Sequence, residues 1–135
     1  MAIRMGTSGV IAALDALLAT LNSGHLYIRS GSVPATCETA DAGTLLGTLT
    51  LNATAFGGAT DGTDKATATA NSITGESSAT AGTAEHFRAK TSGGTVVLQG
   101  TLAVSGGDLN IDTLTIGAGD TINVSGSWIV TMSEA

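Results

Sequence analysis

The sequence predicts an all-β fold, a jelly-roll-like β-sandwich of about eight strands with one short N-terminal helix. Three observations carry this prediction. After residue 24, apolar and small polar residues alternate in short segments, as they do in half-buried strands. Turn-forming residues separate these segments at intervals of roughly 8–12 residues, the spacing typical of sandwiches and barrels. Threonine is abundant, and its β-branched side chain favours strands.

Length and composition fit a single domain over residues 1–135. Hydrophobic residues make up 42% of the chain but aromatic residues only 3%. The core must therefore consist mainly of Leu, Ile and Val, with thin contacts from Ala and Gly. Charged residues make up 12%, about half of the usual ~25%. The net charge of −6 provides no basic surface for nucleic acid or for an anionic membrane, so neither is expected as a partner.

The helix is expected over about residues 8–22. Thr7 and Ser8 can cap its start, and Gly24 is expected to close it in the left-handed conformation. The apolar residues between them recur on one helical face, and must be covered either by a sheet or by another subunit. They are Val10, Ile11, Leu14, Leu17, Leu18 and Leu21.

Strands are expected from about residue 24 to residue 132. Leu26 and Ile28 share one face of the first strand, and the row Leu45, Gly47, Leu49 and Leu51 shares one face of the second. In segment 80–90, Phe87 and Ala89 are expected on one face, with His86 and Arg88 on the other. Residues 92–94, Ser-Gly-Gly, predict a hairpin. The remaining strand segments are 65–74, 95–102, 108–116, 121–124 and 127–132.

No export or membrane signal is expected. The first residues lack an apolar run after Arg4, so they do not form a signal peptide. The apolar cluster 9–21 is interrupted by Asp15 and is shorter than a membrane span. Cys37 is the single cysteine, so an intrachain disulfide is excluded. These features predict synthesis in a reducing cytoplasm.

The best candidate for a metal site is the series Asp108, Asn110 and Asp112, which has the start of a calcium loop. The sixth position of the loop is Thr113 where glycine is needed, and the twelfth is Gly119 where glutamate is needed. Alternation with Leu109 and Ile111 is better explained by a strand with a polar outer face. Neither a metal nor a cofactor is expected.

Other reactive side chains have simpler interpretations. Asp61 and Asp64 are expected in a solvated turn. His25 and His86 have no Cys or His at ligand spacing, so surface or half-buried positions are expected. The carboxylates of Glu38 and Asp41 lie near Cys37 in the sequence and disfavour its thiolate.

The scarce aromatic residues, Trp128, Tyr27 and Phe56, fit either a sugar-binding or interface patch or, preferably, core packing. The sequence contains no P-loop, no G-x-S-x-G motif and no dinucleotide fingerprint. No catalytic residue is predicted, and an enzyme is not expected.

The order of segments resembles that of small virion proteins encoded near the major capsid gene of some tailed bacteriophages. The resemblance implies a head decoration or cement protein on the capsid surface, made in the host bacterial cytoplasm. Such a protein binds the major capsid protein, is often oligomeric (here a homodimer is expected), and has no catalytic residues to transfer. The segments that carry it are Leu21-Asn-Ser-Gly24, Leu26-Tyr-Ile-Arg-Ser-Gly31, Val33-Pro-Ala-Thr36, Gly43-Thr-Leu-Leu-Gly-Thr-Leu-Thr-Leu51, Ala55-Phe-Gly57, Ala84-Glu-His-Phe-Arg-Ala89, Gly94-Thr-Val-Val-Leu-Gln-Gly100 and Asp108-Leu-Asn-Ile111.

Two alternatives remain open from the sequence. The first is a β-module of a phage tail or fibre, which shares the composition. The second is a carbohydrate- or ligand-binding β-sandwich, which an aromatic groove with converging polar groups would favour. A helix or terminus that reaches toward a neighbouring subunit would favour the decoration protein.

Overall fold

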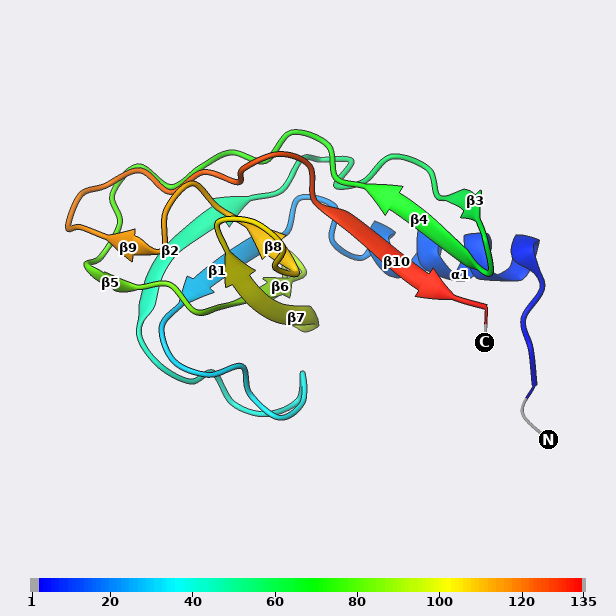
Figure 1. Cartoon of the computed structure of the whole chain (residues 1–135), viewed down its shortest axis with the longest axis horizontal. Helices are drawn as coiled ribbons and strands as arrows, with labels where there is room; N and C mark the ends of the chain where they lie inside the picture. The colour runs from blue at the N-terminus through cyan, green and yellow to red at the C-terminus, as the bar shows by residue number, and fades with distance from the viewer. Residues whose placement is uncertain (1–2, 135) are drawn as a thin grey trace.

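The computed structural model describes residues 3–134 of the chain (Figure 1). One helix and ten strands occur among these residues, in sheets of five, three and two strands, so the predicted all-β class with one short helix is confirmed. In chain order the elements are α1 (Thr7–Ala19), β1 (His25–Arg29), β2 (Leu45–Thr50), β3 (Thr60–Gly62), β4 (Lys65–Thr69), β5 (Gly82–Thr83), β6 (His86–Lys90), β7 (Val96–Ala103), β8 (Leu109–Asn110), β9 (Thr115–Ile116) and β10 (Ile129–Ser133).

Helix α1 buries the predicted apolar stripe against the three-stranded sheet β10-β4-β3. Val10 and Leu14 are fully buried, and Leu18 is 2% exposed. The helix starts one residue earlier than expected and ends at Ala19, before the expected end near residue 22. The N–H groups of Thr20, Leu21 and Asn22 each donate to the carbonyl oxygen three residues earlier, which tightens the chain into turns while Leu21 stays buried.

The residue expected to close the helix was assigned wrongly. Ser23 takes the left-handed conformation, with φ +57°, and its N–H donates to the carbonyl oxygen of Asn52 at 2.9 Å. Gly24 is required for a different reason. A Cβ at this position would lie 2.4 Å from the carbonyl oxygen of Lys90, so only glycine allows the chain to pass the end of β6.

The five-stranded sheet has the order β2-β1-β6-β7-β8. Its pairs are antiparallel except β7–β8, which is parallel. Leu26, Ile28 and Phe87 face the core, as predicted, and the alternation places His86 and Arg88 on the opposite, outer face. The hairpin predicted at residues 92–94 joins β6 to β7.

The register of β2 departs from the prediction at its first residue. Leu45 was expected inside but is 38% exposed, whereas Leu46 is 2% exposed. Ile28 pairs with Gly47 and Arg29 with Leu45, so Leu46 is an extra residue in the pairing of β2 with β1. A bulge of this kind reverses the facing of the side chains beyond it.

Several predicted strands are divided in the structure. Segment 108–116 contains β8 and β9, segment 80–90 contains β5 and β6, and β3 lies outside all of the expected strand segments. Segment 121–124 contributes only isolated bridges, at Ile122 and Val124. The number of strands therefore exceeds the expected eight because many are only two or three residues long.

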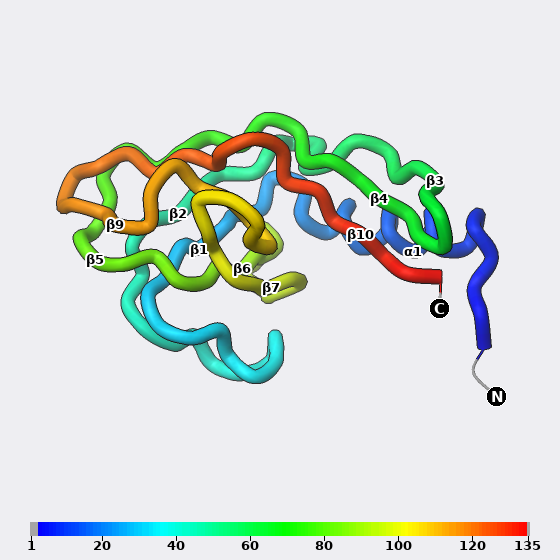
Figure 2. The backbone as a smooth tube through the Cα atoms, viewed as in Figure 1, coloured from blue at the N-terminus to red at the C-terminus, as the bar shows by residue number. Residues whose placement is uncertain are grey.

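The molecule is elongated and bent (Figure 2). The five-stranded sheet and the β5–β9 ribbon form one end, and α1 with the β10-β4-β3 sheet forms the other. The start of α1 and the end of β10 lie at the same end of the molecule.

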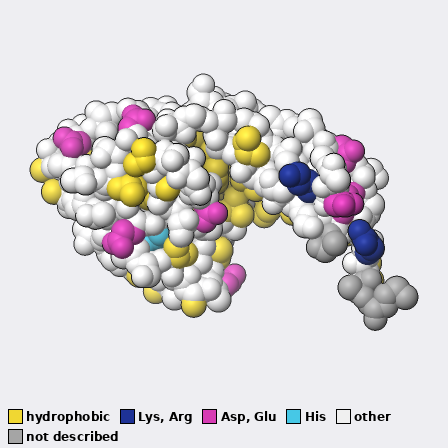
Figure 3. All heavy atoms as spheres, viewed as in Figure 1, with side chains coloured by type: hydrophobic (Ala, Val, Ile, Leu, Met, Phe, Trp, Pro, Cys, Tyr) yellow, Lys and Arg dark blue, Asp and Glu magenta, His cyan; other side chains and the backbone are white. Residues whose placement is uncertain are grey.

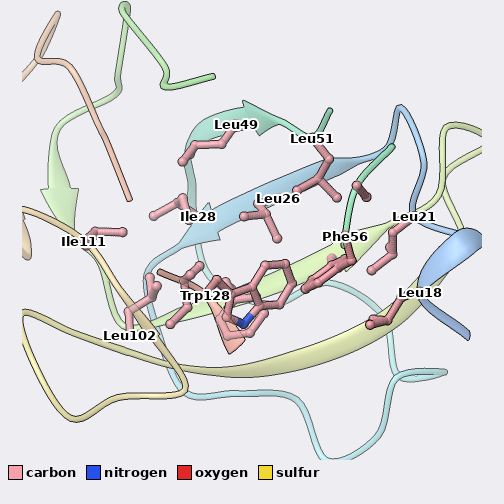
Figure 4. Packing of buried hydrophobic residues seen from close by; sticks show 14 of the residues in the cluster. Leu18, Leu21, Leu26, Ile28, Leu49, Leu51, Phe56, Leu102, Ile111 and Trp128 are labelled. Atoms are coloured by element: carbon pink, nitrogen blue, oxygen red, sulfur yellow. The ribbon is translucent and has the colours of Figure 1, made fainter. Parts of the chain in front are cut away.

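Trp128 connects the two ends through one hydrophobic cluster. Its ring centroid lies 5.0 Å from that of Phe56 and 5.5 Å, edge-on, from that of Phe87. Figure 4 shows Trp128 beside Phe56, with Leu18 and Leu21 from the helix region on the far side of Phe56.

Candidate functional site

A polar cluster on the outer face of the five-stranded sheet fixes residues 30–43, here called the 30–43 loop. Arg88 on β6 is 1% exposed beneath this loop. Its Nη2 donates to the carbonyl oxygens of Thr36 at 3.0 Å and Cys37 at 3.1 Å. Its Nε donates to Oε1 of Gln99 at 3.1 Å. One guanidinium thus binds the loop backbone to two strands.

Asp41, in the same loop, supplies the counter-charge. Its Oδ1 accepts from Arg88 Nη1 at 2.6 Å, and its Oδ2 accepts from Lys90 Nζ at 2.7 Å. These hydrogen bonds, first from Lys90 and then from Arg88, lower the pKa of Asp41 from its usual 3.8 to about 2. A carboxylate held in this way is a weak base, so the cluster suits structural clamping rather than proton transfer.

Glu85 and His86 hold the start of the loop at Gly31. The Gly31 N–H donates to Glu85 Oε2 at 2.6 Å, and the Gly31 carbonyl oxygen lies 2.6 Å from His86 Nδ1. Because a carbonyl only accepts, this contact assigns the imidazole proton to Nδ1. His86 is fully buried, so the expected surface or half-buried position was wrong. The 30–43 loop covers a sheet face that alternation alone would leave in solvent.

A groove of about 470 Å³ lies between β7 and β10. Phe87, Leu98 and Trp128 line it, together with residues 129–131 of β10 and with Asp108. Ile129, on its rim, is 54% exposed. Figure 3 shows hydrophobic side chains in the hollow of this face. Gln99 and Gly107 also line it, and Phe87 and Trp128 are almost fully buried beneath it, so the groove combines polar and apolar surface.

Two of the residues that resemble the start of a calcium loop, Asp108 and Asn110, make hydrogen bonds within the fold. Asp108 Oδ2 accepts from the N–H of Thr101 at 2.9 Å and from its Oγ1 at 3.1 Å. Asn110 Oδ1 accepts from the N–H of Gly107 at 3.0 Å. Asp112 is exposed, and the intervening apolar residues are buried, as the strand interpretation predicted. Within residues 3–134, no three His, Cys, Asp or Glu side chains lie close enough to share a metal ion.

The remaining candidates are dispersed. Asp61 and Asp64 are both exposed. Asp64 lies in the turn between β3 and β4, as predicted, whereas Asp61 belongs to β3 and pairs with Ala66. His25 is half-buried near Tyr27, with ring centroids 6.3 Å apart. Cys37 is half-buried, with its Sγ 3.9 Å from the carbonyl oxygen of Val97.

The aromatic residues divide between two places. Trp128 is 4% and Phe56 is 7% exposed, so both belong to the core, as preferred from the sequence. Tyr27 is on the outer face, where Lys90 Nζ lies 4.6 Å from its ring centroid. The three therefore do not form one patch.

Sequence reasoning missed both the clamp on the 30–43 loop and the groove. The clamp had a partial signal, because Arg88 and Lys90 alternate with apolar residues on a strand and Asp41 is an acidic residue of a long loop. The groove had none, because its lining comes from segments near residues 87, 98, 108 and 128. Only the fold brings these segments together.

Among residues 3–134, α1 is too short to cross a membrane, and no other helix occurs. Comparisons of the chain with protein-family models, with curated proteins and with solved structures find no match. The function has to be inferred from the surfaces of this chain.

Proposed function

We propose that the protein is a structural component of a phage particle, not an enzyme. It decorates the outer surface of the capsid, binds the major capsid protein and holds neighbouring capsid subunits together. The proposal combines the resemblance of its segments to head decoration proteins with the character of its surface.

The proposal rests mainly on apolar side chains that remain exposed in the folded chain. Ile3 is 93% exposed, and Val104 and Ile129 are each 54% exposed. Single exposed apolar residues are common, but here Ile129 borders the groove and Ile3 lies in the projecting segment before α1. A projecting terminus of this kind suits contact with a neighbouring subunit.

The scarcity of charged residues supports binding to the capsid through a large contact surface. Only 12% of the residues are charged, and Arg88, Lys90 and Arg29 all lie within 4 Å of Asp41. A surface with so small a charged fraction is less costly to desolvate when a large area is covered. We therefore expect capsid binding to depend only weakly on salt.

The two alternatives find less support. Stacking on a sugar requires an exposed aromatic face, whereas Trp128 and Phe87 in the groove are 4% and 2% exposed. A tail or fibre module shares the surface character described above, and the symmetry of its copies in the particle distinguishes it.

The test uses DNA-filled heads. The protein is removed, the heads are re-decorated, and the temperature of DNA release is compared with that of stripped heads treated identically without protein. Binding to the intact lattice stabilises it by mass action, about 2.7 kcal/mol per site at a hundredfold excess over Kd, so we expect release at a higher temperature. Equal release temperatures at full occupancy contradict the cementing role. Recovery of the protein only on tails supports the tail module instead.

A further inference from the structure

The side chains of β1, β6 and β7 that hold the 30–43 loop bind mainly to its backbone. Arg29 Nε donates to the carbonyl oxygen of Ala42 at 2.8 Å, and Gln99 Nε2 donates to that of Pro34 at 2.8 Å. With the contacts described above, the bound carbonyl oxygens are spread along the whole loop. They belong to Gly31, Pro34, Thr36, Cys37, Ala42 and Gly43.

This arrangement fixes the loop and leaves its outward side chains available for contact. Ala35, Glu38 and Ala40 are exposed. The hydroxyl oxygens of Thr36 and Thr39 lie 3.0 Å apart, so the turn between them is closed within the loop itself. Among residues 3–134, no ion pair includes Glu38. The loop forms a lobe of its own on one side of the molecule (Figure 2).

Stability alone does not account for this set of polar contacts. Strands β1 and β2 are antiparallel neighbours, which a hairpin loop of about 2–5 residues can join, whereas here residues 30–44 join them. Apolar side chains would cover the outer face of β6 equally well, because a buried ion pair seldom stabilises more than apolar packing does. Contacts to the loop backbone achieve something different, a single loop conformation. A loop that is ordered beforehand loses less entropy when it binds a partner.

We propose that the 30–43 loop is a preorganised surface by which the protein recognises the capsid. This inference rests on the proposed function and names the contact surface. The partner is a largely uncharged region of the major capsid protein with a cation opposite Glu38. The small side chains of Ala35 and Ala40 allow the two surfaces to approach closely, and neither loses rotamer freedom on burial. Glu38 adds a charged contact that favours one orientation.

The first experiment measures the dissociation constant of the full chain on stripped heads. Ala35→Arg places a long side chain in the contact and is expected to weaken binding about tenfold or more. Glu38→Lys sets like charges against each other and is expected to weaken it about tenfold, with a larger effect at low salt. The matched controls are Ala118→Arg and Asp112→Lys, also at exposed positions outside the loop. Both controls should bind within about twofold of the wild type.

The second experiment tests whether the fixed conformation contributes to binding. Arg88→Met keeps every outward side chain of the loop but removes the donors to Thr36 and Cys37. At a temperature where this variant is still folded, its binding to heads should be about tenfold weaker, because the loop must then be ordered on binding. Lys65→Met removes a charge from an exposed position on β4 and should bind as the wild type does.

The third experiment locates the contact without any substitution. Carboxylates of the wild-type protein, free and bound to heads, are coupled to a glycine ester by a carbodiimide, and the modified residues are identified by mass. Glu38 is expected to lose most of its labelling on heads, whereas Asp112 keeps its labelling. This measurement decides the question if a loop variant fails to fold.

The outcomes separate the contact surface from the capsid role. If the wild type binds heads but the loop and control variants bind alike, or if Glu38 is labelled equally in both states, the loop is not the contact and the capsid role stands. If the wild type does not bind heads, the capsid role fails and the recognition loop fails with it.

Discussion

Replacing Arg88 by methionine tests whether the clamp holds the 30–43 loop. Methionine keeps an unbranched side chain of similar length, so it still covers the outer face of β6. It removes the donors to Thr36, Cys37 and Gln99 and the ion pair with Asp41.

The expected loss follows from these contacts. A hydrogen bond to a charged group contributes ~1.5–3 kcal/mol, and removing one partner of a buried ion pair costs ~3–5 kcal/mol. Part of this cost is recovered. When the loop lifts, the carbonyl oxygens of Thr36 and Cys37 bond to water, and Asp41 keeps its bond to Lys90. We therefore expect a loss of about 3–4 kcal/mol, a large part of a typical ~5–15 kcal/mol, and a Tm lower by roughly 10–15 °C.

Urea and thermal unfolding followed by circular dichroism measure this loss. Cleavage by a glutamate-specific protease, with the product at Glu38 identified by mass, reports on the loop itself and should accelerate in the variant. Lys65→Met is the matched control, because it removes the same charge from an exposed position on β4. If Arg88→Met and Lys65→Met unfold and are cleaved alike, the clamp does not hold the loop.

Three further predictions concern the helix, pH and metal. Leu18→Asp places a carboxylate at a 2% exposed position, so we expect unfolding or failed assembly by circular dichroism and sedimentation; the exposed Ala16→Asp is the control, and equal melting of the two refutes the packing. The pKa of Asp41 is lowered on folding from 3.8 to about 2, so its stabilisation is complete above about pH 4 and is lost as the pH falls toward 2. The free energy of urea unfolding should fall across this range in the wild type and change less in Asp41→Asn. Parallel pH profiles of the two proteins argue against a stabilising role of the Asp41 carboxylate. EDTA and millimolar calcium should both leave the Tm unchanged, and a calcium-dependent rise of several degrees would show a site at Asp108 to Asp112.

The sequence by itself determined the local structure. Helical spacing identified Leu14 and Leu18 as buried, because a helix repeats its faces every 3.6 residues whatever it packs against. Strand alternation identified Leu26, Ile28 and Phe87 as core residues, because successive side chains of a strand point to opposite faces. Gly94, with φ +95°, indicated the hairpin because glycine adopts positive φ without strain. Strand alternation wrongly placed Leu45 in the core, because a bulge inserts one residue without leaving a signal in the sequence.

Only the tertiary structure decided which polar residues are buried and which surfaces are open. His86 and Arg88 lie on a face that alternation assigns to solvent, and they are buried because the 30–43 loop folds across it. The groove assembles Phe87, Leu98 and Trp128 from segments far apart in the chain. Local periodicity describes the faces of one helix or strand. A loop that crosses a sheet, or a groove between two strands, depends on contacts between elements, which no single segment encodes.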